Sequence, residues 1–267
     1  WQFYFVLIPL GLISIYSLAP NTPYSWWITF RNYTSLFSGT YAKIFINSAL
    51  LALITATLCL LLAFPVAYYL AVKARRWKNT LLVFLILPSW TSFIIQIYSW
   101  FYLLQKRGLF SNFLYNIGLS SEPLSLLNNY GATVLGMTYC FLPFMVLPLY
   151  TVLERMDKKL LEASADLGAS GWQTLRNIVL PLTQSGIKTG MILVMVPAFS
   201  EFAIPDLMGG FKDMYVGRAI MEKFLIFRDW HSGAAMVILA FCLPLAILAL
   251  HSVMRRTAIF IGLKGKA

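Results

Sequence analysis

The sequence predicts an all-α integral membrane protein of six transmembrane helices, folded as one transmembrane domain over residues 1–267. Of these residues, 59% are hydrophobic and 12% are charged, about half of the ~25% charged residues in typical soluble domains. The mean hydropathy is +0.72. The apolar residues gather in six runs, and each is long enough to cross a bilayer core, which takes a helix of about 20 residues. The runs cover about residues 3–20, 44–72, 80–104, 130–153, 183–205 and 233–254.

Basic residues between the runs indicate the orientation. The short segment 73–78, after the second run, holds four basic residues and no acid, so the positive-inside rule places it in the cytoplasm. Segment 154–182 and both termini then lie in the cytoplasm as well. Twelve Lys and Arg residues fall inside and eight outside. We therefore attribute the net charge of +11 to topology and lipid headgroups rather than to nucleic-acid binding.

Each predicted span contains an internal proline, which removes one backbone hydrogen bond and tends to kink a helix. One interpretation is that these kinks are hinges of a gate. The other, which we favour for any single proline, is a static kink whose freed carbonyl is satisfied by neighbours. The prolines are Pro9, Pro65, Pro88, Pro143 with Pro148, Pro197 and Pro244.

The sequence contains no pattern typical of an enzyme. It has no phosphate-binding G-x-x-x-x-G-K-[ST] loop and no visible Ser-His-Asp set. Its two histidines, His231 and His251, lie at opposite ends of the last run, and its three cysteines lie inside apolar runs as expected packing residues. We therefore expect a non-catalytic chain that binds no metal, cofactor or nucleotide.

A polar stretch between the fourth and fifth runs, residues 161–181, predicts two short helices joined by a turn. In the first helix, Leu160, Ala163 and Leu167 share one face, while Glu162 and Asp166 share another. The small side chains in this helix would let another backbone approach closely.

The turn and the second helix have their own local signals. Gly168 suits the position just past a helix end, where φ is positive. Ser170 and Gln173 have the spacing of a capping box. Pro181 suits the first turn of the next helix, where the missing N–H costs nothing.

This stretch resembles the EAA loop of bacterial ABC-importer permeases. The order Glu162-Ala163-Ser164, then Gly168, then Ile178-x-Leu180-Pro181 matches that pattern in spacing, and Ser164 in place of the second Ala is the one departure. In the family the loop is a cytoplasmic helix that docks into a cleft on the ATPase subunit. The alternative is an ordinary amphipathic loop. The resemblance implies that the ATPase-coupling residues are Glu162, Ala163, Ser164, Asp166, Gly168, Ile178, Leu180 and Pro181.

Several segments further resemble the spermidine/putrescine permease branch of this family. They are 87–91, 141–150, 160–170, 196–210 and 228–230. Many relatives have Arg where Gln96 stands and Pro where Ser185 stands, so the exact ligand stays open. The resemblance implies a type I importer permease in the bacterial cytoplasmic membrane, working by alternating access. It also implies a second, different permease, an ATPase dimer that binds ATP and Mg²⁺, and an extracytoplasmic substrate-binding protein.

Candidate residues of a substrate path lie in the third run and in or just after the fifth run. Glu201 is an ionisable group near the outer end of an apolar span, where such a group is expensive unless it faces a cavity or a partner. Asp206 follows Pro205 near a predicted helix break. Carboxylates and aromatic faces attract the ammonium groups of polyamines, so Trp90 and Tyr98 are also candidates. Gln96, where many relatives have Arg, is a further candidate. The alternatives are a structural hydrogen bond for Glu201, and packing or interfacial anchoring for the aromatic residues.

Two other functions remain open at this point. The same type of importer would suit another small solute, such as a metal ion, thiamine or an opine-like amine. A self-contained secondary transporter would need no ATPase, but inverted internal repeats, which would favour it, are not visible.

Overall fold

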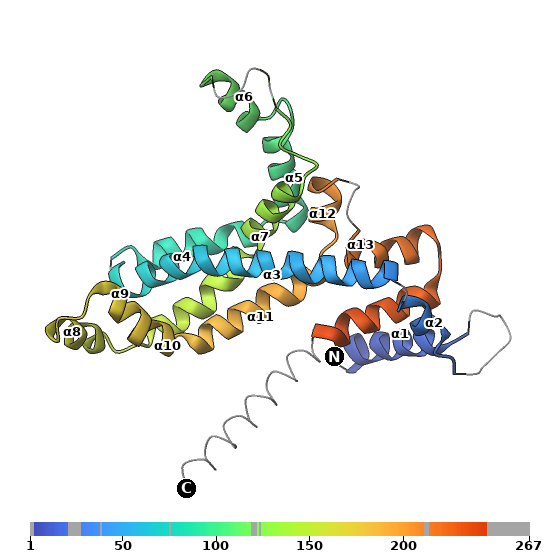
Figure 1. The fold of residues 1–267 in the computed structure, drawn as a ribbon, viewed down its shortest axis with the longest axis horizontal. Coiled ribbons are helices and arrows are strands. Elements are labelled where there is room, and N and C mark those ends of the chain that lie inside the picture. Colours follow the sequence, from blue (N-terminus) through green and yellow to red (C-terminus); the bar gives the residue numbers. More distant parts are fainter. Residues whose placement is uncertain are drawn as a thin grey trace, which may run out of the picture. The chain divides into compact units, whose positions relative to one another are not determined.

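The computed structural model describes residues 3–20, 28–37, 39–74, 76–118, 122, 124–210 and 214–244, and every regular element among them is helical (Figure 1). The chain divides into two compact units. The first unit combines Trp1–Ile46 with Tyr215–Ala267, and the second is Asn47–Met214. The helix α3 (Gly39–Tyr68) begins in the first unit and continues through the second.

In the first unit, a short helix packs against the end of the first apolar run. The run forms a π-helix, Phe3–Leu7, followed by α1 (Ile8–Leu18) with Pro9 in its first turn. The side-chain amide of Asn32, on α2 (Arg31–Leu36), donates hydrogen bonds to the carbonyls of Ser17 and Ala19 at 2.9 and 3.0 Å. These bonds satisfy carbonyl groups at the end of α1, which a helix leaves without partners.

The C-terminal part of the first unit contains α13 (Val216–Met221), a π-helix Glu222–Ile226 and a helix Trp230–Pro244. Asp229 begins the last helix, because its carboxylate accepts the N–H of Ser232 at 3.1 Å and pairs with Lys223 at 3.2 Å. Partial burial raises the pKa of Asp229, but its bonds from Ser232 and Lys223 lower it more, so the net pKa lies below its ordinary value. The predicted remainder of the sixth span, beyond Pro244, lies outside the described residues.

In the part of the chain that the structure describes, two unbroken helices are long and apolar enough to cross a membrane. They are Gly39–Lys73, which combines α3 with a terminal π-helix (Tyr69–Lys73), and α7 (Tyr130–Glu154). Three prolines lie inside α3 and α7 without ending either helix. These are Pro65, Pro143 and Pro148.

The segment of the predicted third span, 80–104, is sharply broken near Pro88, where the sequence indicates a kink. It consists of α4 (Lys78–Ile86), a 3₁₀ turn (Leu87–Trp90) and α5 (Phe93–Leu104). The segments Lys78–Trp90 and Phe93–Asn116 meet at 92°. Pro88 has no N–H for the helix ladder, and Thr91 is extended, so the helix ends here. The predicted outer loop 105–129 also contains a helix, α6 (Leu109–Asn116).

The segment around the predicted fifth span is also broken. Residues Gly171–Leu182 and Gln184–Ser200 are helical and meet at 67° around Thr183. Helix α11 (Gln184–Ser200) runs through Pro197 and ends at Ser200, and α12 (Ala203–Met208) follows. Among the described residues, the helices long and apolar enough to cross a membrane therefore number two, or four if each bent pair counts as one, and shorter apolar helices lie at Phe3–Leu18 and Trp230–Pro244.

Close helix contacts form the core of the second unit. Helix α7 packs against α11 and α12 through glycines that leave room for methionine side chains. A Cβ added to Gly190 of α11 would lie 2.5 Å from the sulfur of Met145, and one added to Gly136 of α7 would lie 2.7 Å from the sulfur of Met208. Small residues of this kind let membrane helices approach closely.

Candidate functional site

Helix α8 (Lys159–Asp166) and helix α9 (Gly171–Thr174) form a hairpin, here called the α8–α9 hairpin, at one end of the second unit (Figure 1). Gly168 ends α8 with φ +74°. Its N–H bonds the carbonyl of Ala165 at 2.9 Å, and the N–H of Ala169 bonds the carbonyl of Ser164 at 3.1 Å. This pair of bonds is a Schellman motif, which confirms the predicted helix end.

The start of α9 is held by the predicted capping box. The hydroxyl of Ser170 accepts the N–H of Gln173 at 3.3 Å, and the side-chain oxygen of Gln173 accepts the N–H of Ser170 at 2.8 Å. The two helices are also tied together by their side chains, because the hydroxyls of Ser164 and Thr174 lie 2.7 Å apart. Ser164, the departure from the EAA pattern, therefore joins α8 to α9 through a hydrogen bond with Thr174.

Helix α8 has two different faces. Leu161 and Ala165, one turn apart, line a cavity. The other face is open: its four residues are all exposed, and Leu167 is 87% exposed. The residues of this open face are Glu162, Ala163, Asp166 and Leu167. Trp172, the second residue of α9, is 66% exposed. Val179, further along the same segment, is buried instead.

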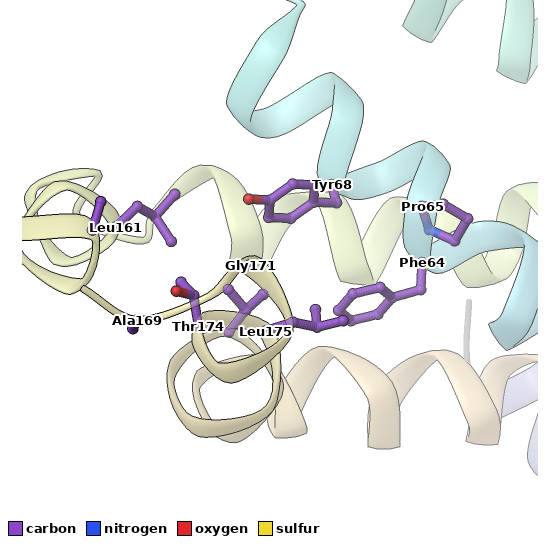
Figure 2. Close-up of a pocket in the computed structure, with 10 residues that line it drawn as sticks. Phe64, Pro65, Tyr68, Leu161, Ala169, Gly171, Thr174 and Leu175 are labelled. Atoms are coloured by element: carbon purple, nitrogen blue, oxygen red, sulfur yellow. The ribbon is translucent and has the colours of Figure 1, made fainter. Parts of the chain in front are cut away.

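The cavity beside the hairpin has a volume of about 540 Å³ and lies between α3 and the hairpin (Figure 2). In Figure 2, Phe64 and Tyr68 point from α3 toward Leu175 and Leu161. Its lining residues come from the end of α3, from α8 and from the segment after it. They are Phe64, Pro65, Tyr68, Leu161, Ala165, Ala169, Gly171, Thr174, Leu175 and Val179.

The segment after α9 joins the hairpin to α11. A π-helix (Leu175–Val179) and α10 (Leu180–Leu182) continue α9, and Pro181 lies in the first turn of α10 as predicted. Ile178 and Leu180 are partly buried. The bend at Thr183 is held by its own hydroxyl, which donates to the carbonyl of Val179 at 2.9 Å.

An ion pair that the sequence did not indicate lies near the ends of α4 and α7. Lys78 pairs with Glu154, and its ammonium lies 5.4 Å from the ring centroid of Tyr150. Its partners are 76 residues apart in the sequence, so no local pattern could predict the pair. It ties the first residue of α4 to the last residue of α7.

Two of the candidate path residues bind the backbone at helix breaks. One carboxylate oxygen of Glu201 accepts the N–H groups of Ala203 and Ile204 at 2.8 and 3.4 Å, which satisfies donors at the start of α12. The side-chain amide of Gln96 donates to the carbonyls of Pro88 and Thr91 at the other break. The side chains of Glu201 and Gln96 are therefore both hydrogen-bonded to backbone groups in this structure.

The remaining path candidates lie on or beside packed helices. Helices α5 and α12 pack against each other, and both pack against α7. Asp206 lies on α12 and is partly buried. Tyr98 on α5 is 43% exposed, and Trp90 is 81% exposed. Other aromatic residues pack between α5 and α7, where Trp100 meets Tyr139 with ring centroids 5.3 Å apart.

The glycine that ends α8 gives a direct test of the hairpin geometry. We expect Gly168→Ala to destabilise the hairpin by about 1 kcal/mol, because a side chain disfavours positive φ. Hydrogen exchange at the amides of Gly168 and Ala169 would then speed up about five-fold. Gly171→Ala is the matched control, because a Cβ has open space at both positions and only Gly168 has positive φ. Equal exchange in both variants would contradict the role of Gly168.

Comparison with known proteins identifies relatives over most of the chain. The family described as binding-protein-dependent transport system inner membrane component matches residues 63–258. The spermidine/putrescine transport system permease protein PotB of Haemophilus influenzae is 39% identical over 241 residues, which cover 89% of this chain and 84% of the relative. The protein of the same name from Escherichia coli is 42% identical over 207 residues, covering 78% and 75%.

Solved structures share the fold. A bacterial ABC transporter involved in the import of the acidic polysaccharide alginate matches with a TM-score of 0.70 at 19% identity, covering 96% of this chain and 91% of the other. The alginate transporter in complex with an alginate pentasaccharide-bound periplasmic protein matches with a TM-score of 0.73 at 17% identity, covering 97% and 91%. By its sequence and its fold, the chain belongs to the family of binding-protein-dependent transport system inner membrane components.

Proposed function

We propose that this chain is the membrane permease subunit of an ATP-driven importer for polyamines, with spermidine and putrescine as its substrates. The observation that supports this most is the identity of 39–42% to spermidine/putrescine permeases over most of the chain. The chain itself is a transport component and not a catalyst. ATP and Mg²⁺ belong to a partner ATPase dimer, and the substrate arrives on an extracytoplasmic binding protein. A second, different permease completes the path.

We infer that the chain crosses the bacterial cytoplasmic membrane six times, as one permease domain with both termini in the cytoplasm. Each of the six apolar runs overlaps an apolar helix: Gly39–Lys73 and Tyr130–Glu154 overlap the second and fourth runs, parts of the two bent pairs overlap the third and fifth, and the shorter helices Phe3–Leu18 and Trp230–Pro244 overlap the first and sixth. The basic segment 73–78 supports a cytoplasmic position for the loop after α3. The α8–α9 hairpin then lies on the same side, where an ATPase can reach it.

The α8–α9 hairpin is the part of the chain that the ATPase moves. Its open face combines small and apolar side chains, Ala163 and Leu167, with the carboxylates of Glu162 and Asp166. The Schellman motif, the capping box and the Ser164–Thr174 contact make it a compact unit. The backbone segment from Gly168 through Ile178, Leu180 and Pro181 transmits the motion of the hairpin to α11. The substrate path between the membrane helices then opens alternately to the two sides of the membrane.

The substrate path runs past the break between α4 and α5 and the break between α11 and α12. Glu201 and Asp206 place negative charge beside one break, and Trp90, Tyr98 and Gln96 lie at or after the other. A polyamine brings several ammonium groups, which favour carboxylates and aromatic faces. Glu201 thus has two roles: it caps α12, and it attracts the cationic substrate.

Reconstitution of the assembly tests the function. Proteoliposomes would contain this chain, the second permease and the ATPase, with the binding protein outside. We expect uptake of labelled spermidine that requires ATP and the binding protein and stops when the ATPase is left out. Uptake by this chain alone would instead identify a self-contained transporter. Displacement of spermidine from the binding protein by thiamine, a metal ion or an opine-like amine at lower concentration would assign another solute.

A further inference from the structure

Helix α4 is held on the second unit with little packing. None of its residues is buried, and Val83 and Phe84 are 53% and 66% exposed. The end of α7 differs, because Leu149 and Leu153 are 0% and 1% exposed. Buried contacts therefore fix the end of α7 in place, whereas packing within this chain leaves α4 free to tilt.

Lys78, the first residue of α4, connects it to the end of α7. Its ammonium pairs with the carboxylate of Glu154 and lies 5.4 Å from the ring centroid of Tyr150. Tyr150 and Glu154 are one helical turn apart on one face of α7, so Lys78 contacts two points along that helix. The side chains of Lys78 and Glu154 are 29% and 41% exposed, and exposed ion pairs add little stability. The contact therefore matters for the position of α4 rather than for the stability of the fold.

The paired end of α7 leads directly into the α8–α9 hairpin. Residues 155–158 join α7 to α8, and local hydrogen bonds hold this segment. The N–H of Met156 donates to the carbonyl of Leu153 at 3.3 Å, and the carboxylate of Asp157 accepts the N–H of Lys159 at 3.0 Å. A movement of the hairpin therefore reaches Glu154 through this segment, just as it reaches α11 through the segment after α9.

At its other end, α4 leads to the bend before α5. The side-chain amide of Gln96 on α5 donates to the carbonyls of Pro88 and Thr91, so a side chain bridges this bend. Trp90 lies at the bend and Tyr98 follows it on α5. A displacement of α4 is therefore passed to the part of the chain that carries these candidate path residues.

We propose that Lys78 is a positioning residue that makes α4 follow the end of α7, so that a movement of the α8–α9 hairpin reaches the bend between α4 and α5. The hairpin then acts in two directions along the chain, forward on α11 and backward on α4. This proposal rests on the proposed function, in which the ATPase moves the hairpin. It adds a second connection between the hairpin and the substrate path.

The amount of spermidine imported per ATP hydrolysed, measured in proteoliposomes with the complete assembly, tests this role. Lys78→Met keeps the aliphatic stem and loses the charge, so we expect this ratio to fall about three-fold with an unchanged melting temperature. Lys78→Arg should keep the ratio. Lys78→Glu alone should lower it further, and adding Glu154→Lys, which restores an opposite pair, should raise it again. Lys106→Met is the matched control, because Lys106 is an exposed lysine between α5 and α6.

Spin labels test the movement of α4 directly. Thr80 on α4 and Thr151 on α7 are both exposed and would carry the labels on introduced cysteines. Cys242, an exposed native cysteine, would be replaced by Ser. We expect pulsed electron paramagnetic resonance to give the same narrow distance in the ATP-free and ATP-bound assembly. Adding Lys78→Met should broaden this distance distribution.

Three results would overturn the proposal. The first is a wild-type ratio of spermidine to ATP in Lys78→Met. The second is a melting temperature that falls together with transport in that variant, because the contact then only stabilises the fold. The third is a label distance that changes between the ATP-free and ATP-bound states, because α4 then moves apart from α7. If the wild-type assembly imports no spermidine, the proposed function fails, while the label distances still test the role of Lys78.

Discussion

Replacing Ala163 by Trp is expected to lower ATP-driven spermidine uptake by more than ten-fold. Ala163 is a small residue on the open face of α8, beside Leu167, which is 87% exposed. A bulky side chain there prevents close docking of the ATPase, and overpacking of a close contact costs about 1–3 kcal/mol. At about 1.4 kcal/mol per factor of ten in affinity, the loss of ATPase binding is large. Uptake in proteoliposomes and the amount of co-purified ATPase measure the effect.

The fold of the chain itself should tolerate this change, because Ala163 is exposed in the isolated chain. Ala42→Trp is the matched control: Ala42 is also small and exposed, but it lies near the start of α3. We expect the Ala42 variant to retain the wild-type rate of spermidine uptake and the wild-type amount of co-purified ATPase. Normal uptake and a normal amount of ATPase in the Ala163 variant would show that the open face of α8 is not the docking surface.

The second large effect is expected at Glu201, where two variants separate charge from capping. In Glu201→Gln the amide oxygen can still accept the N–H groups of Ala203 and Ile204, so the helix break survives while the negative charge is lost. We expect uptake to fall about ten-fold with unchanged thermal stability of the assembly. Glu201→Leu also removes the acceptor, which should cost a further ~1–3 kcal/mol for the unsatisfied N–H groups and lower the melting temperature.

Uptake and thermal stability together distinguish the two roles of Glu201. Wild-type uptake in Glu201→Gln would leave the residue with the capping role alone. Equal losses of stability in both variants would instead mean that the charge itself maintains the break. Ser200→Ala is a suitable control, because Ser200 is the exposed neighbour at the end of α11.

Local structure was predictable where the sequence signal is local. Gly168 marked a helix end and Ser170 with Gln173 marked a helix start, and both are found as predicted. Each signal depends on one backbone angle or on one pair of groups within four residues, so it needs no knowledge of the fold. The six-span count, the orientation and the coupling role stay predictions.

Features that depend on distant residues were not predictable. Pro88 indicated a kink, but not the 92° bend, where the side chain of Gln96 reaches back to donate to the carbonyl groups of Pro88 and Thr91. The role of Ser164 was hidden because its partner, Thr174, lies on the next helix. The cavity needs Phe64 and Tyr68 of α3 to meet the hairpin, and hydropathy shows only that these residues belong to an apolar run.

The glycine–methionine contacts of α7 have a mechanical consequence. Met145 fits against Gly190 on one neighbour, and Met208 of the other neighbour fits against Gly136. Methionine side chains have three rotatable bonds and adapt to irregular gaps. Glycine has no side chain, so nothing projects from its helix toward the methionine. Such seams can shear by small steps without opening holes or forcing side chains into strained rotamers. At the centre of the second unit, α7 can therefore slide along α11 and α12 without first separating from them.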